Sequence, residues 1–313
     1  MDIKIETNHI YNLDCLEGMK YIEDKSIDCI VCDLPYGTTA CKWDIIIPLN
    51  DFVVIDNKTM YLDDYLLYAF KKGITYKEAT QYFNDNKQFG LWYHYNRIIK
   101  DDGAIILFAS QPFTTELANS NISCLRESLV WLKNKAGSGL QAKQKHIKVH
   151  EDILVFSKKG KYKFNPQKWL VDKKEFMTQR KTFNEVEVGN NIYSKMIKKQ
   201  KADTGERNPI SIVSCRVPFN TSKSKTYSDE IEVRQHPTQK PIDLLEYLVK
   251  TFSNEGDTIL DNCMGSGTTA IACINTNRQF IGFELDKNYY ETSLSRIEKL
   301  NKEVNDYETT HSY

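Results

Sequence analysis

The chain has 313 residues, of which 41% are hydrophobic, enough for one large domain with an insertion or for two domains. Its 42 Lys and Arg balance 42 Asp and Glu, so the chain as a whole lacks the charge signature of a protein that binds polyanions. It also lacks an apolar stretch of membrane-spanning length and a signal-peptide core, and its eight cysteines are scattered. We therefore expect a cytoplasmic protein without a membrane partner or a disulfide framework.

The first part of the chain predicts a helix and then a buried strand. Asp14 is placed to cap a helix over residues 15–22. The apolar run over residues 27–32 predicts a buried parallel strand that ends at Asp33. The strand end would present the Asp33 carboxylate, the Pro35 carbonyl and the Tyr36 ring, a set able to bind the edge and face of a flat ring that carries an amine. A strand followed by an ordinary turn is the alternative.

Cysteines 29 and 32 form a C-x-x-C within this strand. Their separation points the two side chains to opposite faces, so we interpret both as core residues and expect no metal site.

Candidate nucleic-acid contacts come from two loops. Residues 37–44 predict a loop that contains Lys42 and Trp43, and residues 133–150 predict a loop that contains Lys135, Lys143 and Lys145. A packed Trp and solvated lysines are the alternative for both loops. From residue 133 to residue 203 there are 18 Lys and Arg against 7 Asp and Glu, which suits a polyanionic partner or simply a solvated face.

The rest of the chain alternates strands and helices around two irregular segments. Residues 45–89 predict an insertion of strands and helices to which we assign no function, and residues 158–234 predict a separate recognition segment. Strands are predicted over residues 104–109, 125–131, 153–156, 258–261 and 280–283, and helices over residues 91–99, 242–252 and 288–300.

From residue 258 to Glu284 the sequence predicts, in order, a strand, a glycine-rich turn, a helix, a second strand and an acidic residue. This order is typical of a Rossmann-type nucleotide site, in which glycines admit the ligand and the acid binds the ribose. The turn reads D-N-C-M-G-S-G-T-T and not G-x-G-x-x-G, which favours a nucleoside carrying a carboxylate over a dinucleotide. A nicotinamide-dependent dehydrogenase is a weaker alternative for the same reason.

Three motifs together resemble those of the β-class amino-methyltransferases of DNA. Members carry D-P-P-Y, then a recognition domain, then H-P-x-Q-K-P and D-P-F-x-G-S-G-T-T. This chain has D-L-P-Y at 33–36, H-P-T-Q-K-P at 236–241 and D-N-C-M-G-S-G-T-T at 261–269, in that order. Leu34 departs from the first motif, and Asn262 and Cys263 depart from the last. A DNA-binding homologue with weakened catalysis is therefore a further alternative.

The resemblance implies a Rossmann-like α/β methyltransferase fold with a mostly parallel, doubly wound sheet, circularly permuted and carrying an inserted target-recognition region. The catalytic half would span residues 1–157, the recognition region 158–234, the cofactor-binding half 235–300 and a tail 301–313. It also implies S-adenosylmethionine as the methyl donor. The implied cofactor-binding residues are Asp14, Cys15, Asp33, His236, Thr238, Lys240, Asp261, Cys263, Gly265, Ser266, Gly267, Thr268, Glu284 and Leu285.

The resemblance further implies methylation of double-stranded DNA on a flipped-out base, with Asp33, Pro35 and Tyr36 as catalytic residues. An aspartate at position 33 favours adenine N6, whereas cytosine N4 and RNA are alternative substrates. A homodimer and a cognate restriction endonuclease are implied partners, in a bacterial or phage-infected cell.

Overall fold

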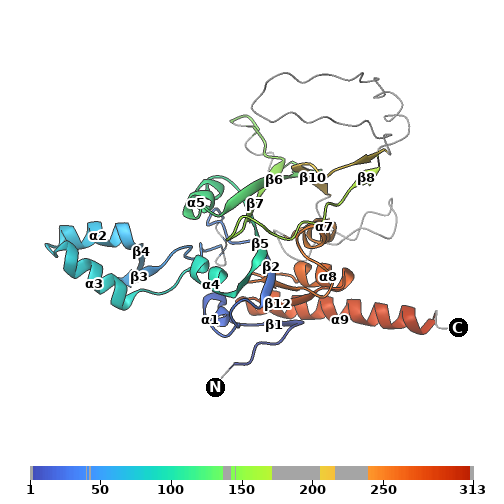
Figure 1. Ribbon diagram of the computed structural model, residues 1–313, viewed down its shortest axis with the longest axis horizontal. Coiled ribbons are helices and arrows are strands. Elements are labelled where there is room, and N and C mark those ends of the chain that lie inside the picture. The colour runs from blue at the N-terminus through green and yellow to red at the C-terminus, as the bar shows by residue number, and fades with distance from the viewer. Residues whose placement is uncertain are drawn as a thin grey trace. The chain divides into compact units, whose positions relative to one another are not determined.

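The fold is built around a mixed β-sheet of eight strands (Figure 1). The computed structural model describes residues 3–39, 41, 44–136, 142–144, 146–170, 205–215 and 239–310. In spatial order the strands are β1 (His9–Tyr11), β12 (Gln279–Phe283), β11 (Thr258–Asp261), β2 (Ile27–Cys32), β5 (Ile99–Ala109), β7 (His150–Phe156), β6 (Leu125–Lys133) and β10 (Ile212–Cys215). All neighbours are parallel except β7, which is antiparallel to β5 and to β6. The predicted mostly parallel α/β sheet is confirmed.

Helices cover both faces of this sheet. On β5, Ile105 and Leu107 belong to a core cluster shared with helices α1 (Cys15–Met19), α4 (Leu91–Ile98) and α5 (Phe113–Ser120). The intervening Ile106 and Phe108 belong to a second cluster shared with α7 (Ile242–Phe252) and α8 (Thr268–Asn275), and α9 (Lys287–Thr310) packs against that cluster. Because side chains alternate along a strand, the two clusters occupy opposite faces. Cys29 and Cys32 likewise fall in different clusters, as predicted.

The direction of winding reverses between β11 and β2. From β11 the chain passes through α8 to β12 on one side, whereas from β2 it passes to β5 on the other side. Ile259 and Leu260 of β11 pair in register with Cys29 and Ile30 of β2. In open α/β sheets the ligand crevice lies outside the strand ends at such a reversal.

Two helices differ in length from the prediction. Helix α1 ends at Met19, and residues 20–22 continue as tighter turns in which each amide donates to the carbonyl three residues earlier. Ile22 is still buried at the end of these turns. Helix α9 extends to Thr310, where the sequence pattern predicted an end at residue 300.

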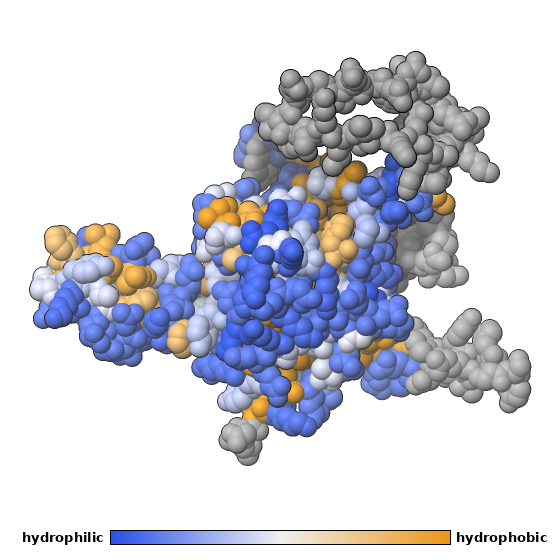
Figure 2. All heavy atoms as spheres, viewed as in Figure 1, coloured by the Kyte–Doolittle hydropathy of each residue, from blue (hydrophilic) through white to orange (hydrophobic). Residues whose placement is uncertain are grey.

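The segment predicted as an insertion is a β-hairpin followed by two helices. Its elements are β3 (Phe52–Ile55), β4 (Lys58–Tyr61), α2 (Leu62–Lys71) and α3 (Tyr76–Asn86). They enclose a small core of their own: Val53, Tyr65, Ala69, Ala79 and Phe83. Apolar side chains also remain on its surface (Figure 2). Among them, Leu67 is 54% and Phe70 is 77% exposed.

Residues Met1–Asn165 and Ser211–Tyr313 form one compact unit, and Pro166–Ile210 form a second. Within the second unit, β8 (Trp169–Leu170) pairs antiparallel with β9 (Glu206–Arg207). Among the helices that the structure describes, none combines the length and the apolar character needed to cross a bilayer.

Candidate active site

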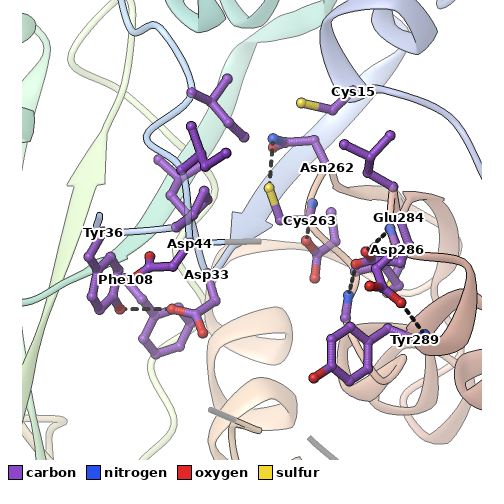
Figure 3. Close-up of a pocket in the computed structure, with 18 of the residues that line it drawn as sticks. Cys15, Asp33, Tyr36, Asp44, Phe108, Asn262, Cys263, Glu284, Asp286 and Tyr289 are labelled. Atoms are coloured by element: carbon purple, nitrogen blue, oxygen red, sulfur yellow. Dashed lines mark hydrogen bonds between the residues drawn. The ribbon is translucent and has the colours of Figure 1, made fainter. Parts of the chain in front are cut away.

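A cavity of about 610 Å³ lies at the carboxyl edge of the parallel strands. It is lined by residues at the ends of β2, β5, β11 and β12 and at the start of the antiparallel β7: Asp33, Phe108, Asp261, Glu284 and Glu151. Figure 3 shows Asp33, Tyr36 and Phe108 on one side of this cavity and Glu284, Asp286 and Tyr289 on the other. The ends of β2 and β11, which the motifs single out, therefore share one cavity.

At the first side of the cavity, Tyr36 turns back onto Asp33. Its hydroxyl donates a hydrogen bond of 2.7 Å to Oδ1 of Asp33, and its ring stacks on Phe113 with a centroid separation of 5.5 Å. Burial raises the pKa of Asp33, and the Lys240 ammonium opposes that shift. Burial and the Asp33 charge raise the pKa of Tyr36 well above its ordinary value, so the phenol stays protonated and donates.

Lys240 connects Asp33 with a second carboxylate, that of Glu151. Its ammonium donates a hydrogen bond to Oδ2 of Asp33 and lies 3.3 Å from Oε2 of Glu151. Lys133 donates to the other oxygen of Glu151, Oε1. Burial lowers the pKa of Lys240, but the charges of Asp33 and Glu151 outweigh burial and raise it overall. Burial acts to raise the pKa of Glu151, but the charges of Lys240 and Lys133 outweigh burial and lower this pKa overall. The four side chains form an alternating chain of opposite charges.

The loop after Tyr36 is folded around the carboxylate of Asp44. Oδ1 accepts from the Gly37 amide at 2.8 Å, and Oδ2 accepts from the amides of Thr38 and Thr39 at 2.9 and 2.6 Å. Asp44 is 7% exposed. It thus orders the backbone of residues 37–39, which follow the Asp33 strand end.

At the other side of the cavity, Glu284 accepts two backbone hydrogen bonds. Gly265 donates to Oε2 and Asp286 donates to Oε1, each at 2.7 Å. Burial raises the pKa of Glu284. The carboxylate therefore ties the glycine-rich turn after β11 to the end of β12.

Asp261 lies between the two sides, at the end of β11. It is 4% exposed, and its oxygens accept from the Thr269 hydroxyl at 2.5 Å and the Cys263 amide at 3.0 Å. Burial raises the pKa of Asp261 to about 6. Its charge state at neutral pH is therefore sensitive to what binds beside it.

Most of the predicted site residues that the structure describes line this cavity: Asp14, Cys15, Asp33, Pro35, Tyr36, Lys240, Asp261, Cys263, Gly265, Ser266, Thr268, Glu284 and Leu285. Gly267 is not among the lining residues; it is the residue before helix α8, with a φ of +83°, and lies close to Ser293. Lys135 and Lys143 are not among the lining residues. His236, Thr238, Lys42, Trp43 and Lys145 lie outside the described residues. Within the described part of the chain, no group of three His, Cys, Asp or Glu side chains could hold a metal ion.

Several lining residues were missed by the sequence analysis. Glu151, Asp44 and Asp286 are the charged ones among them, and Phe108 and Tyr289 add aromatic surface. The only trace of Glu151 in the sequence is that it and Asp152 stand directly before an apolar run. That pattern points to the site only if the strand runs antiparallel to its neighbours.

The two departures from the family motifs are accommodated in the structure. Leu34 is 3% exposed and packs in the core cluster around α1 and α4. Oδ1 of the buried Asn262 accepts a 2.5 Å hydrogen bond from the Tyr95 hydroxyl. Because residue 263 is a cysteine, the cavity wall has no aromatic ring at that position. Tyr289 from α9 supplies a ring on the Glu284 side (Figure 3).

Comparison with known families decides the class of the protein. The model of a DNA methylase family, N6_N4_Mtase, matches residues 27–295. The chain belongs to this family. The type II methyltransferase M.HindIII of Haemophilus influenzae is 25% identical over 92% of this DNA methylase and 94% of that protein. The DNA adenine methyltransferase YhdJ of Escherichia coli is 30% identical over 65% of this chain and 63% of that protein.

Solved structures resemble the methylase in fold. The cytosine-N4-specific PvuII DNA methyltransferase aligns with a TM-score of 0.52 at 12% identity, over 94% of this chain and 87% of that one. The complex of M1.HpyAVI with SAM aligns with a TM-score of 0.50 at 20% identity, over 92% and 98% of the two chains.

Proposed function

We propose that this methylase transfers a methyl group from S-adenosylmethionine to the N6 amino group of an adenine that has been flipped out of double-stranded DNA. The observation that carries the proposal is the single cavity shared by Asp33 and Tyr36 on one side and Glu284 and Gly265 on the other. Family membership and the named relatives support the same reaction class.

The Glu284 side of the cavity fits a nucleoside that carries an amino acid. A Cβ on Gly265 would meet nothing nearer than the Cys263 carbonyl at 4.0 Å, so the backbone faces open space there. Glu284 offers acceptors to ribose hydroxyls, and Asp261 offers a carboxylate to an ammonium group. We assign these residues, with Asp14, Cys15 and Leu285, to cofactor binding. When bound, the cofactor would supply an electrophilic methyl group on a sulfonium.

The Asp33 side of the cavity fits the amino edge of a base. An aromatic amine is a weak nucleophile because its lone pair is conjugated with the ring. Acceptance of its two N–H hydrogens by Asp33 and the Pro35 carbonyl would make that nitrogen more nucleophilic and fix its direction. Stacking on Tyr36 would contribute about 1–3 kcal/mol toward holding a base outside the duplex.

The choice of adenine over cytosine depends on Asp33 and on the relatives. YhdJ is named an adenine methyltransferase, whereas the PvuII enzyme is named cytosine-N4-specific. The DNA substrate would place the reaction in the cytoplasm of a bacterial or phage-infected cell. Several relatives are named type II methyltransferases, so a restriction endonuclease and a second copy of this chain are the protein partners that we propose to test.

The test uses the full chain, tritiated S-adenosylmethionine and unmethylated DNA of mixed sequence. We expect labelled N6-methyldeoxyadenosine after digestion of the DNA to nucleosides, and base-level modification sequencing then maps the site. Label in N4-methyldeoxycytidine would overturn the adenine assignment. Retardation of DNA in a gel without any transfer would favour the DNA-binding homologue without catalysis.

The matched variant is Asp33→Asn, which keeps the size of the side chain and removes its charge. We expect loss of transfer, with the Kd for S-adenosylmethionine changed less than about threefold by calorimetry. Normal turnover at saturating cofactor, combined with weaker cofactor binding, would contradict the proposed role of Asp33.

A further inference from the structure

Both oxygens of Asp33 already accept a hydrogen bond. Oδ1 accepts from the Tyr36 hydroxyl at 2.7 Å and Oδ2 accepts from the Lys240 ammonium. Each oxygen of an ionised carboxylate keeps a second lone pair, so an amino group that binds here either shares an oxygen with one of these donors or displaces that donor. The competing donor of the same chemical kind is Lys240, because it too is a nitrogen that offers N–H hydrogens.

A second acceptor for the lysine is close by. Oε2 of Glu151 lies 3.3 Å from the Lys240 nitrogen, and yet this buried oxygen accepts no hydrogen bond from any residue that the structure describes. The two charges already form an ion pair at this distance, and a small movement of the ammonium toward Oε2 would complete a charge-assisted hydrogen bond. Glu151 itself is fixed from its other side, where Lys133 donates to Oε1.

The surroundings allow Lys240 to change partner while it stays buried. Its side chain is 7% exposed, and its nitrogen lies 5.0 Å from the centroid of the Phe108 ring and 5.9 Å from that of the Tyr36 ring. Such rings stabilise a cation without fixing it to one acceptor. A movement between the carboxylates of Asp33 and Glu151 keeps the number of charges in the cluster constant. The movement leaves Asp33 with two neutral donors, the Tyr36 hydroxyl and the incoming amino group, while the ammonium stays inside the same cluster of charges.

We infer that Lys240 holds the acceptor oxygen of Asp33 until the target amino group arrives, and that Glu151 then accepts the displaced lysine. Glu151 is thus a positioning residue that acts through Lys240 and does not touch the base. The inference rests on the proposed function, since it requires an amino-bearing base at Asp33.

The test replaces Glu151 by Gln, which keeps the shape and removes the charge that would receive the lysine. Two duplexes with the mapped site are compared, one with adenine and one with purine, which lacks only the 6-amino group, at the target position. We expect Glu151→Gln to reduce binding of the adenine duplex relative to the purine duplex at least fivefold. We also expect the single-turnover rate of transfer to fall at least tenfold, with the Kd for S-adenosylmethionine changed less than threefold.

Two further variants complete the design. Glu151→Asp keeps the negative charge and should restore at least part of the preference for adenine. Glu127→Gln is the matched control, because Glu127 also accepts a hydrogen bond, from the Tyr162 hydroxyl at 2.8 Å, but does not line the cavity. It should leave both measurements unchanged.

The outcomes separate this inference from the proposed function. If the wild type transfers no methyl group to any base, the proposed function fails and the exchange of Lys240 fails with it. If the wild type is active and Glu151→Gln weakens both duplexes equally, weakens cofactor binding or leaves the rate intact, the exchange alone is overturned.

Discussion

The Tyr36 hydroxyl donates to Oδ1 of Asp33 across only two intervening residues, so the end of strand β2 folds its aromatic ring back toward its own carboxylate. This contact gives Tyr36 two separable properties. Its ring offers a stacking surface, and its hydroxyl orients the group that we assign to the target amine. Substitutions at position 36 can remove the second property without the first.

Tyr36→Phe should therefore be milder than Tyr36→Ala. Loss of one hydrogen bond costs about 0.5–1.5 kcal/mol, so we expect a reduction in kcat/KM of less than about tenfold for the Phe variant. Loss of stacking costs about 1–3 kcal/mol, so the Ala variant should lose roughly a further 5- to 150-fold. The measurement is steady-state methyl transfer to DNA that carries the mapped site.

The control for this series is Tyr21→Ala, since Tyr21 is 43% exposed and does not line the cavity. Equal losses for the Phe and Ala variants at position 36 would assign the whole effect to the hydroxyl and exclude stacking.

Glu284→Gln should weaken cofactor binding with little effect on turnover at saturation. An amide has only one oxygen, so it cannot accept from both the Gly265 and the Asp286 amides, as the carboxylate does. Hydrogen bonds to a charged group contribute about 1.5–3 kcal/mol, which corresponds to roughly a 10- to 150-fold higher Kd. Calorimetric titration with S-adenosylmethionine measures this Kd. Kinetics at saturating cofactor should give a kcat within about threefold of the wild type.

Glu291→Gln on α9 is the matched control, because its side chain is 60% exposed. A fall in kcat at saturation, with the Kd unchanged, would instead associate Glu284 with the reacting groups.

The two glycines of the turn should respond differently to alanine. Both have positive φ, +55° at Gly265 and +83° at Gly267, so each variant carries backbone strain of about 1–2 kcal/mol. A Cβ at position 267 would also lie 2.9 Å from the Ser293 Cβ, whereas one at 265 meets open space. Gly267→Ala should therefore lose more free energy of unfolding, and Gly265→Ala more cofactor affinity, at least tenfold.

Chemical denaturation and calorimetry on the two variants compare these losses. The double variant Gly267→Ala with Ser293→Gly removes the facing Cβ and should regain part of the lost stability. Equal destabilisation by both single alanine variants would show that contact with Ser293 is unimportant.

The sequence predicted correctly those elements whose side-chain pattern is compatible with only one local structure. The apolar run 27–32 is buried on both faces, so it had to be an interior strand, and Asp33 had to lie at its end. The glycine turn before α8 was equally clear, because positive φ at Gly265 and Gly267 is a property that glycine supplies. These two patterns predicted both sides of the cavity before the strands were placed side by side.

Other site residues could not be predicted because their place depends on tertiary contacts. The apolar run before Phe156 looks the same in a parallel and an antiparallel strand, and only the pairing of β7 brings Glu151 to the carboxyl edge. Asp44 reads as an ordinary loop residue, and its role arises from backbone amides that the loop gathers around it. The sequence pattern also did not distinguish helix α1 from the tighter turns of residues 20–22 that follow it.

His94 should make the stability of the protein fall as the pH is lowered from about 6.5 to about 4. It is 2% exposed on α4, and neither ring nitrogen has a hydrogen-bond partner among the described residues. Burial lowers its pKa from 6.5 to about 4. Between these values the unfolded chain binds a proton that the folded protein excludes, so the free energy of unfolding decreases with decreasing pH.

His94→Phe keeps a ring of similar size and removes the titrating group, so it should flatten this part of the pH dependence. It should also be neutral or stabilising at pH 7, since the histidine nitrogens lose no hydrogen bond. Urea denaturation at intervals between pH 4.5 and 7.5 measures both effects, with the exposed His146→Gln as control. Burial raises the pKa of Asp261 to about 6 and so gives the opposite slope, which is why the difference between variant and wild type is the quantity to compare. An unchanged difference across this range would show that His94 does not titrate as proposed.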